Sequence, residues 1–155
     1  MFEDSPEAFV ARFRTYAASV ELFSHLEGSP LLECRAGDVI IQVFERTGPY
    51  LSNPGRQSAI VNPTTERLES RPPGIRHLEA TGLGRVRAEG LVLAREASFA
   101  IVDAGIPLVV SVHGGIGDEI ASGGWVAFDS EVPVHAFVLP ASRSDRQAAD
   151  SDEQV

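Results

Sequence analysis

Apolar residues recur at three- and four-residue spacing at the start of the chain and follow the shorter period of strands in most of the rest. The helical spacing begins after Ser5-Pro6-Glu7. This segment offers a hydroxyl to cap free N–H groups, a proline at the first helical position and an acid near the positive end of the helix dipole. Gly28 and Pro30 end the pattern. We therefore predict an amphipathic helix over residues 6–27.

The predicted helix has an aromatic face. Such a face can pack on a sheet of the same chain or on a partner subunit, and the sequence leaves both arrangements open. If the face points outward, it forms a partner-binding surface together with two aromatic residues further along the chain. The predicted contact residues are Phe9, Phe13, Tyr16, Val20, Phe23, Tyr50 and Trp125.

After Pro30 the pattern becomes extended. Two short apolar runs, 31–35 and 39–44, flank Ala36-Gly37-Asp38, which predicts a β-hairpin. The stretches 46–57 and 62–76 are rich in proline and glycine and are predicted as loops. Because long loops in a small domain are often functional, we expect an interaction surface there.

From Gly84 onward the strands are more regular. Alternating residues begin at Arg85, and Gly90 changes the phase, which predicts a bulge or a sharp bend. The pattern predicts five strands in this region, which begin near residues 85, 98, 107, 125 and 134. We expect a mainly β fold, a single barrel or sandwich with one N-terminal amphipathic α-helix. It would form one domain over 1–140, with β structure in 31–140 and a polar tail over 141–155.

Residues 84–140 contain a long strand bent at a glycine, a hairpin through Asp103-Ala104-Gly105 and two closing strands. In strand order and bend position this segment resembles an OB-fold, the small five-stranded barrel, and a jelly-roll-like barrel or sandwich is the alternative. OB-folds that bind single-stranded nucleic acid combine basic grooves with stacking aromatics. The resemblance implies that the residues for such a role are Arg85, Arg87, Arg95 and Trp125.

Composition narrows the function classes. Hydrophobic residues make up 43% of the 155 residues and charged residues 23%, which suits an ordinary folded core. No apolar run is long enough to span a membrane, and the start of the chain lacks the pattern of a signal peptide, so we expect a cytoplasmic protein without membrane contact. The formal charge of −9 disfavours a broad nucleic-acid-binding face. All 13 basic residues are arginine, which favours a GC-rich or halophilic source.

Candidate chemistry is sparse. His113 and His135 could share a metal ion if their strands are neighbours, which gives a small metal-dependent enzyme as one alternative. The segment 107–115 resembles the His-Gly-Gly loop of α/β-hydrolases, but no Gly-x-Ser-x-Gly nucleophile motif occurs, so that fold is excluded. The lone Cys34 lies in a strand pattern and is predicted to be structural. We expect no cofactor and no catalytic residue.

The sequence therefore favours a non-catalytic assembly subunit. The chain combines an aromatic helix, long loops and a polar tail. These features are typical of a subunit that binds other proteins, either as a homo-oligomer or within a larger complex. A virion component such as a capsid, connector or tail subunit is the specific form of this hypothesis, with the virion as its location. An OB-type binding module for single-stranded nucleic acid or protein is the alternative of a different class.

Overall fold

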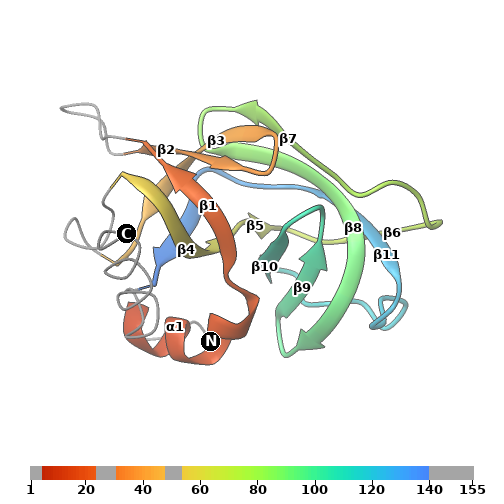
Figure 1. The fold of residues 1–155 in the computed structure, drawn as a ribbon. Helices are drawn as coiled ribbons and strands as arrows, with labels where there is room; N and C mark the ends of the chain where they lie inside the picture. The colour runs from red at the N-terminus through yellow and green to blue at the C-terminus, as the bar shows by residue number, and fades with distance from the viewer. Residues whose placement is uncertain (1–4, 24–30, 48–53, 140–155) are drawn as a thin grey trace, which may run out of the picture.

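The computed structural model describes residues 5–23, 31–47 and 54–139. Strands dominate the described chain, and one short helix precedes them (Figure 1). The helical elements are α1 (Pro6–Phe13) and the 3-10 turn η1 (Arg14–Tyr16). The strands are β1 (Ala18–Leu22), β2 (Leu32–Ala36), β3 (Val39–Glu45), β4 (Gly55–Asn62), β5 (Thr64–Thr65), β6 (Glu69–Arg71), β7 (His77–Gly82), β8 (Arg85–Glu96), β9 (Phe99–Asp103), β10 (Pro107–Val112), β11 (Trp125–Asp129) and β12 (Val134–Val138).

A closed barrel of five strands forms one half of the molecule. Its strand order is β1-β2-β3-β12-β4, and β1 pairs with β4 to close the ring. All pairs are antiparallel except β3 with β12, which run parallel. Closure leaves these strands without a free edge, which removes the main route to unwanted strand pairing.

A curled second sheet forms the other half. Its strands follow the order β5-β10-β9-β8-β11-β6, and β7 pairs with the first part of β8. The 12-residue strand β8 curves along this sheet (Figure 1) and pairs on one edge with both β7 and β9. One buried cluster contains residues of both halves, including Val43 of β3 and Val92 of β8, so the barrel and the second sheet share a core.

The mainly β fold with a single N-terminal helix is confirmed, but the predicted extent of the helix is wrong. α1 ends at Phe13, and residues 18–22 of the predicted helix form strand β1. Ala18, Val20 and Leu22 are buried and alternate with more exposed residues, a strand pattern that overlaps helical spacing at Val20. Pairing of β1 with both β2 and β4 outweighs the weak helix preference of so short a segment.

The start of α1 agrees with the prediction. The Ser5 side chain accepts a hydrogen bond from the backbone N–H of Ala8, Pro6 occupies the first turn, and Glu7 lies near the positive end of the helix dipole. The helix places Phe9 and Phe13 against a second buried cluster, which includes Ile60 and Phe137 on the outside of the barrel. The aromatic face therefore packs mainly on its own chain.

The OB-like resemblance predicts a five-stranded barrel within residues 84–140. The structure does contain a closed five-stranded barrel, but most of its strands come from an earlier part of the chain. Four of its strands come from residues 18–62, and β12 is the barrel strand contributed by 84–140. The predicted strands of this region all form, yet β8 to β11 build the second sheet. The order of strands along the sequence does not show which sheet each strand joins.

Local predictions have mixed outcomes. The hairpin of β2 and β3 is confirmed. The segment 62–76, predicted as loop, contains the short strands β5 and β6, and β4 begins at Gly55 inside the other predicted loop. The irregularity expected at Gly90 lies between Val92 and Ala94. Residues 141–155 and Tyr50 lie outside the described residues.

Candidate functional site

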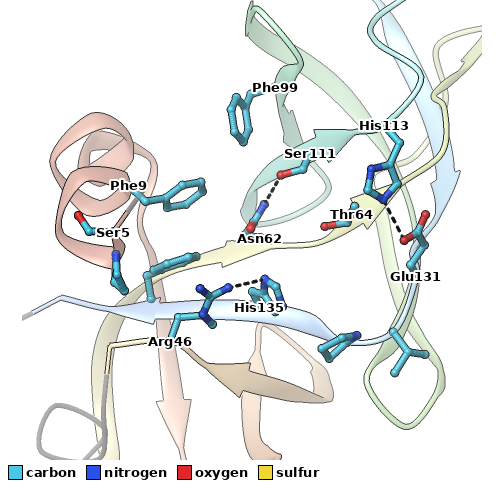
Figure 2. Close-up of a pocket in the computed structure, with 14 residues that line it drawn as sticks. Ser5, Phe9, Arg46, Asn62, Thr64, Phe99, Ser111, His113, Glu131 and His135 are labelled. Carbon is cyan, nitrogen blue, oxygen red and sulfur yellow. Dashed lines mark hydrogen bonds and ion pairs between the residues drawn. The ribbon is translucent and has the colours of Figure 1, made fainter. Parts of the chain in front are cut away.

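A pocket of about 370 Å³ lies where the outside of the barrel meets the second sheet (Figure 2). The start of α1 forms one side of it, β4 and β12 contribute from the barrel, and β5, β9 and β10 contribute from the second sheet. Pockets of this size at the junction of two structural units commonly hold small molecules. The pocket is therefore the strongest candidate for a functional site in the described part of the chain.

The pairing of β4 with β12 explains which side chains reach the pocket. Asn62 lies opposite His135, and Ile60 lies opposite Phe137. Because side chains alternate along a strand, the residues between them, such as Val61 and Ala136, point into the barrel core. The side chains that point outward toward the pocket at this end of the two strands are those of Asn62, His135 and Phe137.

Three phenylalanines form an apolar wall. Phe9 of α1 stacks on Phe137 of β12, with ring centroids 4.3 Å apart. Phe99 of β9 meets the Phe9 ring edge-on at 5.9 Å. All three rings are buried, and all three line the pocket. The three rings therefore give this side of the pocket an apolar character.

Two buried polar side chains, Asn62 and Ser111, also line the pocket. The Asn62 amide nitrogen donates to the backbone carbonyl of Val109 over 2.7 Å and to the Ser111 hydroxyl over 3.0 Å. These bonds connect β4 of the barrel to β10 of the second sheet. The pair is therefore held in place by both halves of the molecule.

At another side of the pocket Arg46 contacts His135. The Arg46 Nη1 lies 3.4 Å from Nδ1 of His135, and the guanidinium lies 5.8 Å from the centre of the Phe137 ring. Burial lowers the pKa of His135 below its usual value, and the positive charge of Arg46 lowers it further. The imidazole is therefore neutral near pH 7, and Arg46 supplies the positive charge.

His113 and Glu131 form a second polar pair at the rim. Nε2 of His113 lies 3.0 Å from a Glu131 carboxylate oxygen, and the two side chains are 39% and 47% exposed. Both residues are fixed through β5: the His113 N–H donates to the Thr65 carbonyl, and the Glu131 N–H donates to the Thr64 carbonyl. The backbone thus brings together two residues that are 18 positions apart.

The two histidines of the metal hypothesis line the same pocket. Each has its own partner, however, since His113 contacts Glu131 and His135 contacts Arg46. The described residues contain no group of three or more His, Cys, Asp or Glu side chains that could hold a metal ion. A guanidinium beside His135 also opposes a second cation at this side of the pocket.

The predicted partner-binding residues do not form one surface. Phe9, Phe13 and Val20 are buried in the cores of the chain, and Tyr16 is half-buried beside α1. Phe23 is half-buried at the end of β1, where Arg35 lies over its ring. Trp125 is half-buried on β11, with Arg76 over its ring.

The arginines of the nucleic-acid hypothesis are also dispersed. Arg85 is exposed, and Arg87 pairs with Asp129 and Glu89. Arg95 lies opposite the buried Ala100, on the other face of β8 from Arg87. Its guanidinium donates to the backbone carbonyls of Gly117, Ile120 and Ile116. Arg87 and Arg95 are engaged within the fold and lie on opposite faces of β8, so the three arginines form no common basic groove with Trp125.

No family model, curated protein or solved structure matches this chain. Within the described residues, no helix is both long enough and apolar enough to cross a membrane.

Sequence reasoning missed most of the polar residues of the pocket. Arg46 and Asn62 lie at the edges of the predicted loops 46–57 and 62–76, and Ser111 is one position within a predicted strand. The sequence does suggest His113 and His135 as a pair, although as ligands of a metal ion. No local pattern could reveal the others, because they meet only through the packing of the barrel against the second sheet.

Proposed function

We propose that the protein binds a small organic acid with an apolar body in the pocket between its two halves. The observation that carries this proposal is the position of Arg46, at the side of a pocket whose apolar wall consists of three phenylalanine rings. The acid group of the ligand would bind the guanidinium, and its apolar part would lie on the rings.

The charge of Arg46 supports an anionic ligand. Within the described residues, Arg46 forms an ion pair with no carboxylate, unlike Arg12, Arg76 and Arg87. Its contact with His135 uses one of the five N–H groups of the guanidinium, so donors remain for a carboxylate. The start of α1, which lines the same pocket, adds a weak positive dipole.

The ligand class can be tested with 3-phenylpropionate, which combines one carboxylate with one phenyl ring. We expect saturable binding by calorimetry and chemical-shift changes at residues around the pocket. Arg46→Gln should weaken binding about 3- to 10-fold, because Arg46 is exposed and its interaction with a carboxylate is partly screened.

Arg56→Gln is the matched control. Arg56 lies at the far end of β4, contacts Ser19 and does not line the pocket, so its loss should leave the affinity unchanged. If 3-phenylpropionate shows no binding at millimolar concentration, or if the two variants weaken it equally, the proposal is wrong.

The assembly role remains a second proposal. The buried positions of Phe9 and Phe13 remove the outward aromatic face on which it relied, but Ile75 and Leu83 are 85% and 73% exposed. Single exposed apolar side chains are common on monomeric proteins, so these two residues mark positions where partner contact can be tested. In this second proposal the protein forms a homo-oligomer or part of a larger complex. It would be located in the cytoplasm, or in a virion if the complex is viral.

Light scattering across salt concentrations tests the assembly role, with the full chain beside Leu83→Ser and beside a variant that ends at residue 140. A stable oligomer that weakens in either variant would support the role. A monomer in all three samples would contradict it and leave the pocket as the remaining basis for function.

A further inference from the structure

We infer that the ligand carries a hydroxyl group in addition to its acid group, so that the pocket recognises a hydroxy acid. This inference rests on the proposed function and makes its ligand class specific. It depends on two buried side chains, Asn62 and Ser111, which together offer one hydrogen-bond acceptor and one donor to the pocket.

The orientation of the Asn62 amide is determined by its neighbour. Val109 presents a backbone carbonyl at 2.7 Å, and a carbonyl can only accept, so the group that faces it must be the amide nitrogen. The second hydrogen of this nitrogen goes to the Ser111 hydroxyl at 3.0 Å, and the Pro63 carbonyl at 3.5 Å is a weaker neighbour. Both hydrogens are therefore used.

The Asn62 oxygen is the unused half of this side chain. No hydrogen bond to Oδ1 is present among the described residues, although Asn62 is only 4% exposed. A sealed oxygen without a partner would be costly. Among the described side chains, Trp125 Nε1 is the one fully buried polar atom that lacks a hydrogen-bond partner. The Asn62 oxygen, which also lacks a partner, is therefore not fully buried, and it must open to the pocket that Asn62 lines.

Ser111 supplies the complementary donor. Its oxygen accepts the bond from Asn62, so its own hydrogen remains to be donated, and no acceptor for it is present among the described residues. Ser111 is 6% exposed and also lines the pocket. An acceptor and a donor therefore lie side by side, close to the rings and to His135 (Figure 2).

A hydroxyl group satisfies both atoms, because it can donate to the Asn62 oxygen and accept from Ser111. An ammonium group has no acceptor and would leave the Ser111 hydrogen unmatched. A methylene group would leave both side chains unpaired in a buried position. Glu131 could also accept a hydrogen bond from a ligand, but it lies at the solvated rim and already contacts His113. It therefore distinguishes less between a hydroxyl and an ammonium group than the two buried side chains do.

The test compares ligands on the unmodified protein. Affinities for 3-phenyllactate (each enantiomer), 3-phenylpropionate and phenylalanine are measured by calorimetry under one set of conditions. We expect the better enantiomer of 3-phenyllactate to bind on the order of 10-fold more tightly than 3-phenylpropionate, since the latter leaves two buried polar groups unpaired. Phenylalanine should bind more weakly than 3-phenyllactate.

Variants then locate the preference. Asn62→Leu and Ser111→Ala should each reduce the preference for 3-phenyllactate, while Arg46→Gln should weaken both acids and leave their ratio unchanged. Because the first comparison uses the unmodified protein, it remains decisive even if Asn62→Leu fails to fold.

The outcomes separate the inference from the proposal on which it rests. Equal affinity for 3-phenyllactate and 3-phenylpropionate would overturn the hydroxyl inference and leave the binding of organic acids intact. Phenylalanine binding as tightly as 3-phenyllactate would overturn the assignment of a hydroxyl group. If none of the three compounds binds, the proposed function fails, and the inference fails with it.

Discussion

Arg46 donates a hydrogen bond to Nδ1 of His135, and this contact joins the end of β3 to the parallel strand β12. Because a guanidinium can only donate, Nδ1 must accept, and the neutral imidazole carries its hydrogen on Nε2. Protonation of His135 would replace this bond with a contact between two positive charges. The pair therefore makes the fold sensitive to pH.

The first prediction concerns stability below neutral pH. The pKa of His135 is lowered in the folded protein by burial and by Arg46, so the unfolded chain binds this proton more readily. The contribution of His135 is intact above its ordinary value of about 6.5 and is lost as the pH falls below that value toward the folded pKa. Urea unfolding between pH 8 and pH 5 should show this loss, with a slope below about 1.4 kcal/mol per pH unit for one proton.

His135→Gln should flatten this part of the stability profile. His77→Gln provides the control, because the His77 side chain is 54% exposed and contacts Glu79 at the surface. An NMR titration that places the pKa of His135 above that of an unfolded histidine would contradict the prediction.

The second prediction concerns Gly90 in β8. A Cβ at this position would lie 2.1 Å from the backbone carbonyl oxygen of Asp103, which cannot move without disturbing the pairing of β8 with β9. Gly90→Ala should therefore lower the free energy of unfolding by ~1–3 kcal/mol, as measured by chemical unfolding. Gly82→Ala, where the nearest atom is 4.0 Å away, should have little effect. Equal stability of the two variants would contradict the assigned role of Gly90.

The third prediction concerns Arg95. Its guanidinium serves three backbone carbonyls of the segment 116–120, a geometry that a lysine cannot reproduce. Arg95→Lys should lower the free energy of unfolding by ~1–3 kcal/mol and should increase amide hydrogen exchange in this segment. Arg87→Lys, which changes pairs with partly exposed carboxylates, should cost less than about 1 kcal/mol. Unchanged exchange in Arg95→Lys would show that the segment is held by other contacts.

The fourth prediction concerns the reactivity of Cys34. This residue is 1% exposed, and burial raises the pKa of its thiol to about 12, so the reactive thiolate is scarce at pH 8. A thiol reagent should modify the native protein slowly and the urea-unfolded protein at once. Cys34→Ala identifies any background reaction. Rapid reaction of the native protein would mean that β2 opens easily.

The structure shows where local pattern suffices and where it fails. The hairpin at Gly37 and the strands from Arg85 onward follow from alternation and turn residues, which act over a few positions. Residues 18–22 fit the predicted helix because Val20 suits both periods, and the pairing of β1 with β2 and β4 decides in favour of a strand. A strand formed by distant pairing carries little local information.

The candidate site was less predictable than the fold. The sequence suggests His113 and His135 because their imidazoles could share a metal ion if their two strands are neighbours. Nothing in the sequence indicated that Arg46 would lie beside one of them or that Glu131 would lie beside the other. These neighbours set the charges around the two histidines, and they come from different strands and connecting segments.

The position of β12 in the barrel has a consequence for synthesis on the ribosome. β12 lies between β3 and β4, so the barrel cannot close until residues 134–138 have left the exit tunnel. Until then β3 and β4 each present an unpaired edge, while about 70 further residues are translated after Asn62. A nascent chain at this stage would depend on chaperones or on early folding of the second sheet, and a premature stop before Val134 would release a protein prone to aggregation.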